Sequence, residues 1–175
     1  LDPDFVMTVG DMIQGYGGEA KWLAEMRQYH NVMDELKMPW FPVCGNHDVY
    51  ERPHTEQGHI DLYKKHFGPL YYSFDYKWAH FICLFSDEQM KFHNPSVNQN
   101  MSEKQMQWLR KDLAATDAEQ IFVFLHHPRW LYEGCNWPDV HEILAEDGRV
   151  EAVFAGHIHT YRYDGVQDGI RYYAL

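Results

Sequence analysis

Short apolar runs recur along the chain, and each is bounded by glycine, proline or polar residues. Runs of this length that are rich in β-branched and aromatic residues are typical of β-strands. They predict strands at residues 5–9, 40–43, 70–75, 78–85, 121–125 and 150–155. The short turn between the third and fourth runs favours a hairpin. The tail, residues 160–175, has the pattern of antiparallel strands that turn near Gly165 and Gly169.

Helical periodicity appears between these runs. From residue 19 to about residue 37, apolar side chains recur at the spacing of an amphipathic helix, which Pro39 closes. Further helices are predicted near residues 57–67, after Ser102, and at residues 139–145. Ser102 and Gln105 have the spacing of a capping box. Alternating strands and helices predict a layered α/β domain with mixed sheets, and no linker or repeat divides residues 1–175.

Composition and charge narrow the possible functions. The chain has 175 residues, 45% of them hydrophobic, which suits one folded domain with a buried core. Its formal net charge of -11 disfavours binding to nucleic acid and to anionic membranes. A phosphate-bearing substrate would therefore need a local source of positive charge, such as bound divalent cations. No run is long enough to span a bilayer, and we assign neither a cellular location nor an oligomeric state.

Cysteine usage does not indicate a disulfide scaffold or a zinc knot. The three cysteines are widely spaced, and none has the paired spacing of zinc ligands. We interpret Cys44 and Cys83, which lie within apolar runs, as small buried hydrophobic residues.

Potential metal ligands follow four of the apolar runs. Asp11, Asn46, His126 and the pair His157 and His159 each come shortly after a run ends. Sites in layered α/β folds gather at the carboxyl ends of strands, so these side chains are expected to converge. Carboxylate, amide and imidazole groups together suit Mn, Fe or Zn.

Each motif also has an ordinary structural reading. A Gly-Asp pair is a common turn, asparagine and aspartate often serve in turns, and His126 and His127 before Pro128 could simply leave a strand. His157 and His159 lie on the same side of an extended segment, which is a moderate metal signal. The four motifs in this order are far more specific than any one of them.

The ordered set resembles the calcineurin-like metallophosphoesterase superfamily, and its bacterial phosphodiesterase and purple-acid-phosphatase-like branches in particular. The matching residues are Gly10-Asp11, then Gly45-Asn46-His47-Asp48, then His126, then Gly156-His157-x-His159. The resemblance implies a layered sandwich of two mixed β-sheets flanked by helices, with two divalent metal ions at the strand ends.

The resemblance also implies a role for each matching residue. Asp11 would bridge both metals, His159 would bind at the first site, and Asn46, His126 and His157 would complete the second site. His47 would face the substrate without binding metal, and Asp48 would orient the His47 ring. The family's opening Asp-x-His motif has no match upstream of Asp11, although Asp2 and Asp4 lie there. We therefore expect that the chain lacks the first strand and is truncated at both ends.

The implied reaction is hydrolysis of a small phosphomonoester or phosphodiester by a water activated between two metals. His47 is the candidate for protonating the leaving oxygen or for stabilising the transition state. Three alternatives stay open: a non-catalytic metal-binding or protein-interaction scaffold of the same fold, a nuclease, and an unrelated metal hydrolase. The acidic charge counts against the nuclease.

Several other residues receive weaker assignments. His127 and Arg129 could touch the substrate, but a supporting or surface role is expected for both. Trp130, Tyr132 and Trp137 are expected in a pocket or in the core. The remaining histidines are interpreted as surface or packed residues: His30, His54, His59, His66, His80, His93 and His141.

Overall fold

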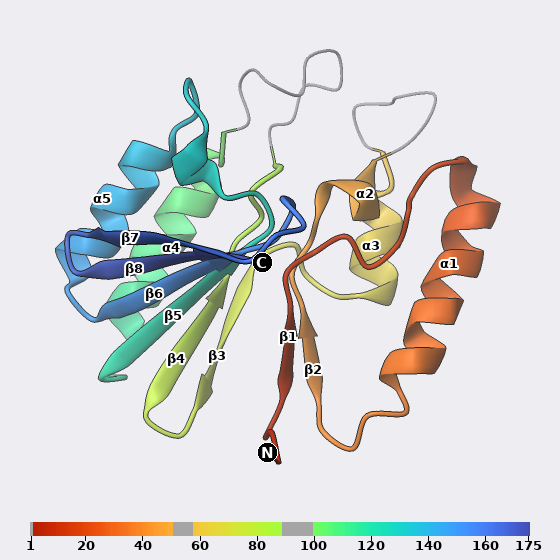
Figure 1. Ribbon diagram of the computed structural model, residues 1–175, viewed down its shortest axis with the longest axis horizontal. Helices are drawn as coiled ribbons and strands as arrows, with labels where there is room; N and C mark the ends of the chain where they lie inside the picture. The colour runs from red at the N-terminus through yellow and green to blue at the C-terminus, as the bar shows by residue number, and fades with distance from the viewer. Residues whose placement is uncertain (1, 51–57, 89–99) are drawn as a thin grey trace.

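A computed structural model describes residues 2–50, 58–88 and 100–175. The protein is built from a six-stranded sheet and a two-stranded sheet, with helices on the outer side of each (Figure 1). His54 and His93, together with most of the predicted loop at residues 94–100, lie outside the described residues. Among the described residues, no helix combines the length and apolarity needed to cross a membrane.

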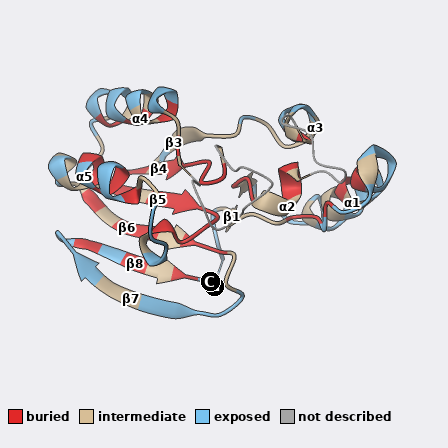
Figure 2. Ribbon diagram, turned by 90° about the horizontal axis from the view of Figure 1, so that it is seen from above, coloured by how far each residue is buried: buried red, intermediate tan, exposed pale blue. Residues whose placement is uncertain are grey.

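The large sheet is mixed and has the order β3-β4-β5-β6-β8-β7. Its central pairs β4–β5, β5–β6 and β6–β8 are parallel, whereas β3–β4 and β7–β8 are antiparallel hairpins. Its strands are β3 (Tyr72–Tyr76), β4 (Ala79–Cys83), β5 (Gln120–Leu125), β6 (Val150–Ala155), β7 (Arg162–Gln167) and β8 (Ile170–Ala174). Figure 2 shows that the inner strands are largely buried, while β7 forms an exposed edge.

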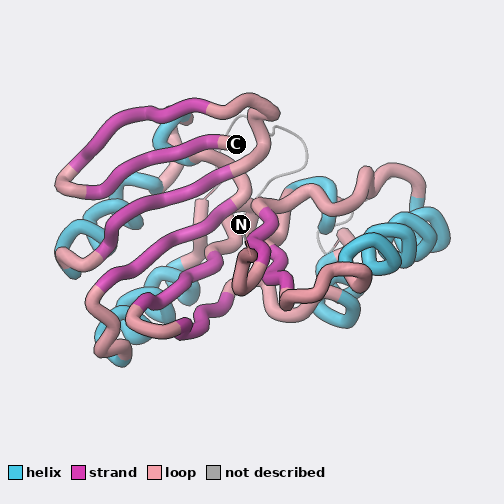
Figure 3. Tube along the Cα trace, turned by 60° about the horizontal axis from the view of Figure 1, so that its bottom comes forward, coloured by secondary structure: helices cyan, strands magenta, loops and turns pink. Residues whose placement is uncertain are grey.

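The small sheet contains β1 (Val6–Thr8) and β2 (Trp40–Pro42), which pair in parallel. Figure 3 shows this sheet beside the large one. Aromatic side chains fill the contact between the two sheets. Phe41 stacks on Phe74 with a centroid distance of 3.9 Å, and Phe5 meets Phe81 edge to face at 5.1 Å. This packing fixes β1 and β2 against β3 and β4.

Helices cover the other faces. On the large sheet, α4 (Glu103–Ala115) and α5 (Trp137–Asp147) bury a continuous, largely aliphatic cluster, here named the helix-facing cluster. Beside the small sheet lie α1 (Gly18–Met33), α2 (Asn46–Val49) and α3 (Ile60–His66). Alternation along β5 explains how one strand serves two layers. Ile121 and Val123 belong to the helix-facing cluster, whereas Phe124 belongs to the cluster shared with the small sheet.

The predicted layered α/β fold with two flanked sheets is confirmed. Cys44 and Cys83 are buried, as predicted. The capping box at Ser102 forms only in part. The Ser102 hydroxyl accepts the Gln105 amide at 3.1 Å, but the Gln105 side chain bonds to the backbone of Phe85 instead of returning to Ser102.

Several element boundaries differ from the prediction, most of them by one or two residues. Helix α1 ends at Met33, and the predicted polar strand end at residue 46 begins the short helix α2. In the tail, the tight turn falls only at Asp168–Gly169, because Gly165 lies within β7 at a register irregularity. Local periodicity does not specify these details, because packing between distant segments decides them.

Candidate metal centre

The carboxyl ends of four strands meet at one place. β1 leads to Asp11, β2 to Asn46, β5 to His126 and β6 to His157. The His126 ring reaches the loop after β1, where the Val9 carbonyl lies 2.7 Å from its Nδ1. Parallel pairing of β1 with β2 and of β5 with β6 thus brings residues far apart in sequence together.

Glycine permits the close approach of these loops. Gly10 has a φ of +93°, and a Cβ there would lie 2.7 Å from His126 Cγ and 2.8 Å from Gly45 Cα. A Cβ on Gly45 would collide with the backbone nitrogen of Asp11. Only glycine at both positions lets the chain bring Asp11 and His126 into contact.

Three potential ligand atoms lie close to His126 Nε2. His126 Nε2 lies 3.1 Å from Asp11 Oδ2, 3.0 Å from Asn46 Oδ1 and 3.3 Å from His157 Nδ1. His126 Nδ1 donates its hydrogen to the Val9 carbonyl, so the lone pair of the neutral ring is on Nε2, beside these three atoms. Ligands about 2.1 Å from a tetrahedral ion lie roughly 3.4 Å apart, and the three distances from His126 Nε2 are close to that value. Asp11, Asn46, His126 and His157 are therefore the candidate ligands, here named the quartet.

The electrostatics of the quartet favour a cation. Burial alone would raise the pKa of the Asp11 carboxyl, but the hydrogen bond and charge of His126 outweigh it and lower that pKa. Burial likewise would lower the pKa of His126, yet the hydrogen bond and charge of Asp11 raise it. Burial, followed by the neighbouring His127 and His126, lowers the pKa of His157 to about 4. His157 is therefore neutral near pH 7, as a metal ligand must be.

Asp48 has a different role from the one expected. Its fully buried carboxylate accepts the backbone amides of Gly45 at 2.7 Å, Asp11 at 2.9 Å and Ile13 at 3.3 Å. Burial is the main cause that raises its pKa to about 7. Asp48 therefore ties together the two loops that carry Asp11 and Asn46. It does not orient the His47 ring, because its oxygens are turned toward backbone amides.

The His47 ring is oriented by two residues that the sequence analysis did not single out. Its Nδ1 lies 2.7 Å from the Gln14 carbonyl, and its Nε2 lies 3.1 Å from the Tyr16 hydroxyl. The His47 backbone amide donates to Asp11 Oδ1 at 2.9 Å, which places the ring beside the quartet. One feature of the sequence points to Gln14 and Tyr16. They lie at the glycine-rich loop of residues 15–18, and a loop this close to a ligand motif is a candidate part of the site.

His159 takes no part in the hydrogen bonds that join the quartet in the part of the chain that the structure describes. It is exposed and has a φ of 53°. Within the described ranges, no hydrogen bond or ion pair joins it to Asp11 or to the other candidate ligands. Its predicted role at a first metal site therefore stays a prediction.

The positions of the remaining residues in the fold decide between the roles that the sequence left open for them. His127 and Arg129 are buried and contact Asp87, so a surface role is wrong for both. Trp137 is buried in the helix-facing cluster, and Trp130 packs against it. Tyr132 is exposed and lies edge to face with His127 at a centroid distance of 6.0 Å.

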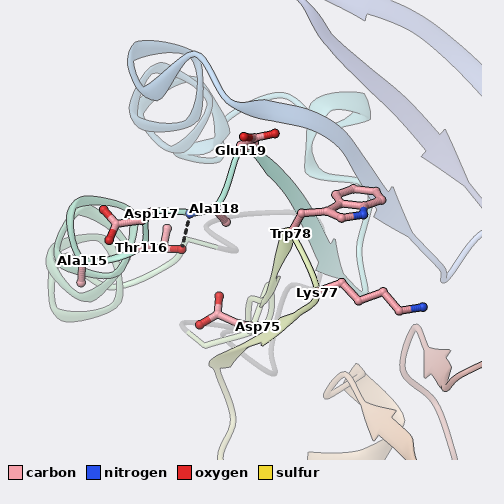
Figure 4. Close-up of a pocket in the computed structure, with 8 residues that line it drawn as sticks. All are labelled: Asp75, Lys77, Trp78, Ala115, Thr116, Asp117, Ala118 and Glu119. Carbon is pink, nitrogen blue, oxygen red and sulfur yellow. Dashed lines mark hydrogen bonds between the residues drawn. The ribbon is translucent and has the colours of Figure 1, made fainter.

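Two cavities help to delimit the site. One groove runs between residues 11–14 and α1, where Asp11 and Gln14 face Glu25 and Tyr29. The pocket in Figure 4 lies at the opposite ends of β4 and β5, around Trp78 and Glu119, and is remote from the quartet. Only the first groove adjoins the candidate ligands.

Comparisons with known proteins agree on one family. The sequence profile of the calcineurin-like phosphoesterase family matches residues 1–161. "Purple acid phosphatase 22" of Arabidopsis thaliana is 30% identical over 71% of the chain and 31% of its own length. "Probable cyclic nucleotide phosphodiesterase" of Moraxella catarrhalis is 22% identical over 91% of the chain and 59% of its own length. The chain thus spans less than two thirds of the length of either relative.

A solved structure supports the fold. A dimetal phosphatase from Danio rerio aligns with a TM-score of 0.68 at 19% identity, over 98% of this chain and 72% of that one. At this level of identity the similarity shows only that the two proteins share a fold.

Proposed function

Because the chain belongs to the calcineurin-like phosphoesterase family, we propose that it hydrolyses a small phosphomonoester or phosphodiester at a centre of two divalent metal ions. The observation that carries the proposal is the quartet around His126 Nε2. Two of its three partners contribute oxygen and one contributes nitrogen, all within 3.0–3.3 Å. This mixed donor set suits Mn, Fe or Zn.

The residues of the centre divide into two groups. Asn46, His126 and His157 would hold one ion together with Asp11, and Asp11 would share the second ion with His159. When bound, the two ions supply a water of lowered pKa and neutralise charge on the phosphoryl oxygens. Asp48 holds the backbone of Asp11 in place, which keeps the carboxylate aimed at the shared position.

His47 is proposed as the acid that assists the leaving group. Its Nδ1 is held by the Gln14 carbonyl, so its Nε2 is the atom available for proton transfer. The Tyr16 hydroxyl at 3.1 Å keeps that atom hydrogen-bonded and orients the ring before substrate binds. A leaving oxygen would replace Tyr16 as the partner of Nε2.

The substrate class follows from charge. The net charge of -11 disfavours binding of long nucleic acids, so a small phosphoester is the better candidate. The named relatives include both a phosphatase and a phosphodiesterase, and both ester types therefore belong in the test.

The test compares hydrolysis of p-nitrophenyl phosphate and bis(p-nitrophenyl) phosphate by metal-loaded protein. The His126→Gln variant should lose both activity and metal, while His141→Gln, a buried histidine on α5, should keep both. Metal binding without hydrolysis of either ester would support the second candidate, a metal-binding scaffold. That candidate is favoured by the lack of a hydrogen bond or ion pair between His159 and Asp11 among the described residues. Absence of bound metal would refute both.

A further inference from the structure

A second polar cluster is centred on Asp87 and includes His127, whose ring lies next to that of His157. Asp87 is fully buried, and its carboxylate contacts His127 Nδ1 at 2.8 Å and Arg129 Nη2 at 3.1 Å. The Ser86 hydroxyl donates to Asp87 Oδ2 at 2.8 Å and accepts the His127 backbone amide at 2.9 Å. His127 is thus held at both its backbone and its ring.

Stability alone is a weak explanation for this cluster. Burying a charged pair costs desolvation energy, and apolar replacements of buried ion pairs are often equally stable. Arg129 also donates through Nε and Nη2 to the Ser86 carbonyl, at 3.0 and 2.7 Å, so the cluster is hydrogen-bonded throughout. Its clearest effect is to fix the orientation of one ring, that of His127.

That orientation directs His127 toward the quartet. Because Nδ1 donates to Asp87, the lone pair of His127 is on Nε2. The ring lies 3.6 Å from the His157 ring and 5.0 Å from the His126 ring, measured between centroids. The three histidines can each offer one ligand atom, all within 4.8 Å of one another.

Packed histidines elsewhere in the chain provide an internal comparison. His80 bonds through both ring nitrogens, to Asp75 and Asp112. His141 likewise bonds through both nitrogens. His127 differs from both, because among the residues that the structure describes only its Nδ1 has a hydrogen-bond partner. A carboxylate on one nitrogen and an open second nitrogen is the usual arrangement of a metal-ligating histidine.

We propose that His127 is a further ligand of the metal ion held by Asp11, Asn46, His126 and His157. The inference rests on the proposed metal centre and adds a third imidazole to it. Three imidazoles, one carboxylate and one amide oxygen favour a transition ion such as Zn²⁺ over Mg²⁺ or Ca²⁺. Asp87 is the positioning residue, since it acts through the His127 ring.

The test is a Co²⁺ titration of the chelator-treated full chain, followed by visible absorption, with a competing chromophoric chelator to obtain affinity. His127→Gln should bind Co²⁺ at least about tenfold more weakly, and its absorption should change in intensity and position because a ligand is lost. Asp87→Asn, which keeps the imidazole, should weaken affinity by about 10- to 100-fold. His141→Gln should match the wild type in both readouts.

The outcomes separate this inference from the proposed function. Wild-type affinity and spectrum in both His127→Gln and Asp87→Asn would overturn the role of His127 and leave the quartet intact. Failure of the wild-type chain to bind Co²⁺ or Zn²⁺ would overturn the metal centre itself. Should His127→Gln fail to fold by circular dichroism, the result for Asp87→Asn alone decides, since unchanged binding there would refute the inference.

Discussion

His126 Nε2 lies 3.0 Å from Asn46 Oδ1, although neither atom carries a hydrogen when the His126 Nδ1 proton is donated to Val9. Two lone pairs at this distance repel unless a positive charge lies between them. A proton and a metal ion compete for that position. Against the effect of burial, Asp11 raises the pKa of His126, which adds to this demand for positive charge.

The close approach at Gly10 predicts a specific loss of metal. Gly10→Ala would place a methyl group against the His126 ring and separate it from Asp11. Gly165→Ala is the matched control, because its φ of +97° is nearly the same but nothing lies within 4 Å of the new Cβ. Both variants should lose about 1–2 kcal/mol of unfolding free energy from backbone strain. Only Gly10→Ala should also lose bound metal by elemental analysis, and equal metal content in the two would contradict the site geometry.

Asp48 is predicted to act through the backbone. Asp48→Asn replaces one acceptor oxygen with an NH₂ group that faces amide donors, so it should lower the free energy of unfolding by about 1–3 kcal/mol. Metal affinity should fall with it, because the amides of Asp11 and Gly45 lose their anchor. Chemical denaturation and metal titration measure the two effects. Exposed Glu142→Gln serves as the control, and the idea fails if Asp48→Asn is no less stable than that variant.

Removal of His47 should separate catalysis from metal binding. His47→Ala should retain the metal content of the wild type and lower kcat by about 100-fold or more, because the leaving group loses its acid. Tyr16→Phe should lower kcat by less, since the ring loses one hydrogen bond but keeps Gln14. Tyr161→Phe, at an exposed position, should leave kcat unchanged. Normal turnover by His47→Ala would remove His47 from the mechanism.

His80, which is not part of the candidate metal centre, should make the stability of the fold depend on pH. Burial lowers the pKa of His80, but the hydrogen bonds and charges of Asp112 and Asp75 outweigh it and raise that pKa. The folded state therefore binds the proton more tightly than the unfolded state, whose histidine pKa is about 6.5. The stability contribution is complete below that value and is lost as pH rises through the folded pKa.

The measurement is the difference in unfolding free energy between the wild type and His80→Gln. We expect a larger difference near about pH 5.5 than near about pH 9, on either side of the ordinary histidine pKa. The comparison cancels the titration of groups that both proteins share. A difference that stays constant or grows toward high pH would show that His80 gains nothing from its two carboxylates.

The sequence predicted the quartet because each member follows an apolar run at a strand end. Parallel pairing of β5 with β6 and of β1 with β2 then brings these ends together. The same rule would have found Asp87, which follows the apolar run at residues 78–85. It was missed because an aspartate after a serine matches no ligand motif.

Other features depend on contacts between distant segments. The partners of Asp48 and His47 could not be read from spacing, since several nearby acceptors suit the same histidine. In the folded protein, the loop before α1 brings Gln14 and Tyr16 into contact with the His47 ring. The buried state of Arg129 is also a long-range result, because its partner Asp87 lies 42 residues away.

Anomalous X-ray diffraction at the absorption edge of the bound metal tests the central claim most directly. Crystals of protein purified without chelator should show a peak within coordination distance of His126 Nε2, Asn46 Oδ1, Asp11 Oδ2 and His157 Nδ1. Metal-loaded crystals with no peak there, or with a peak only at other residues, would contradict the account.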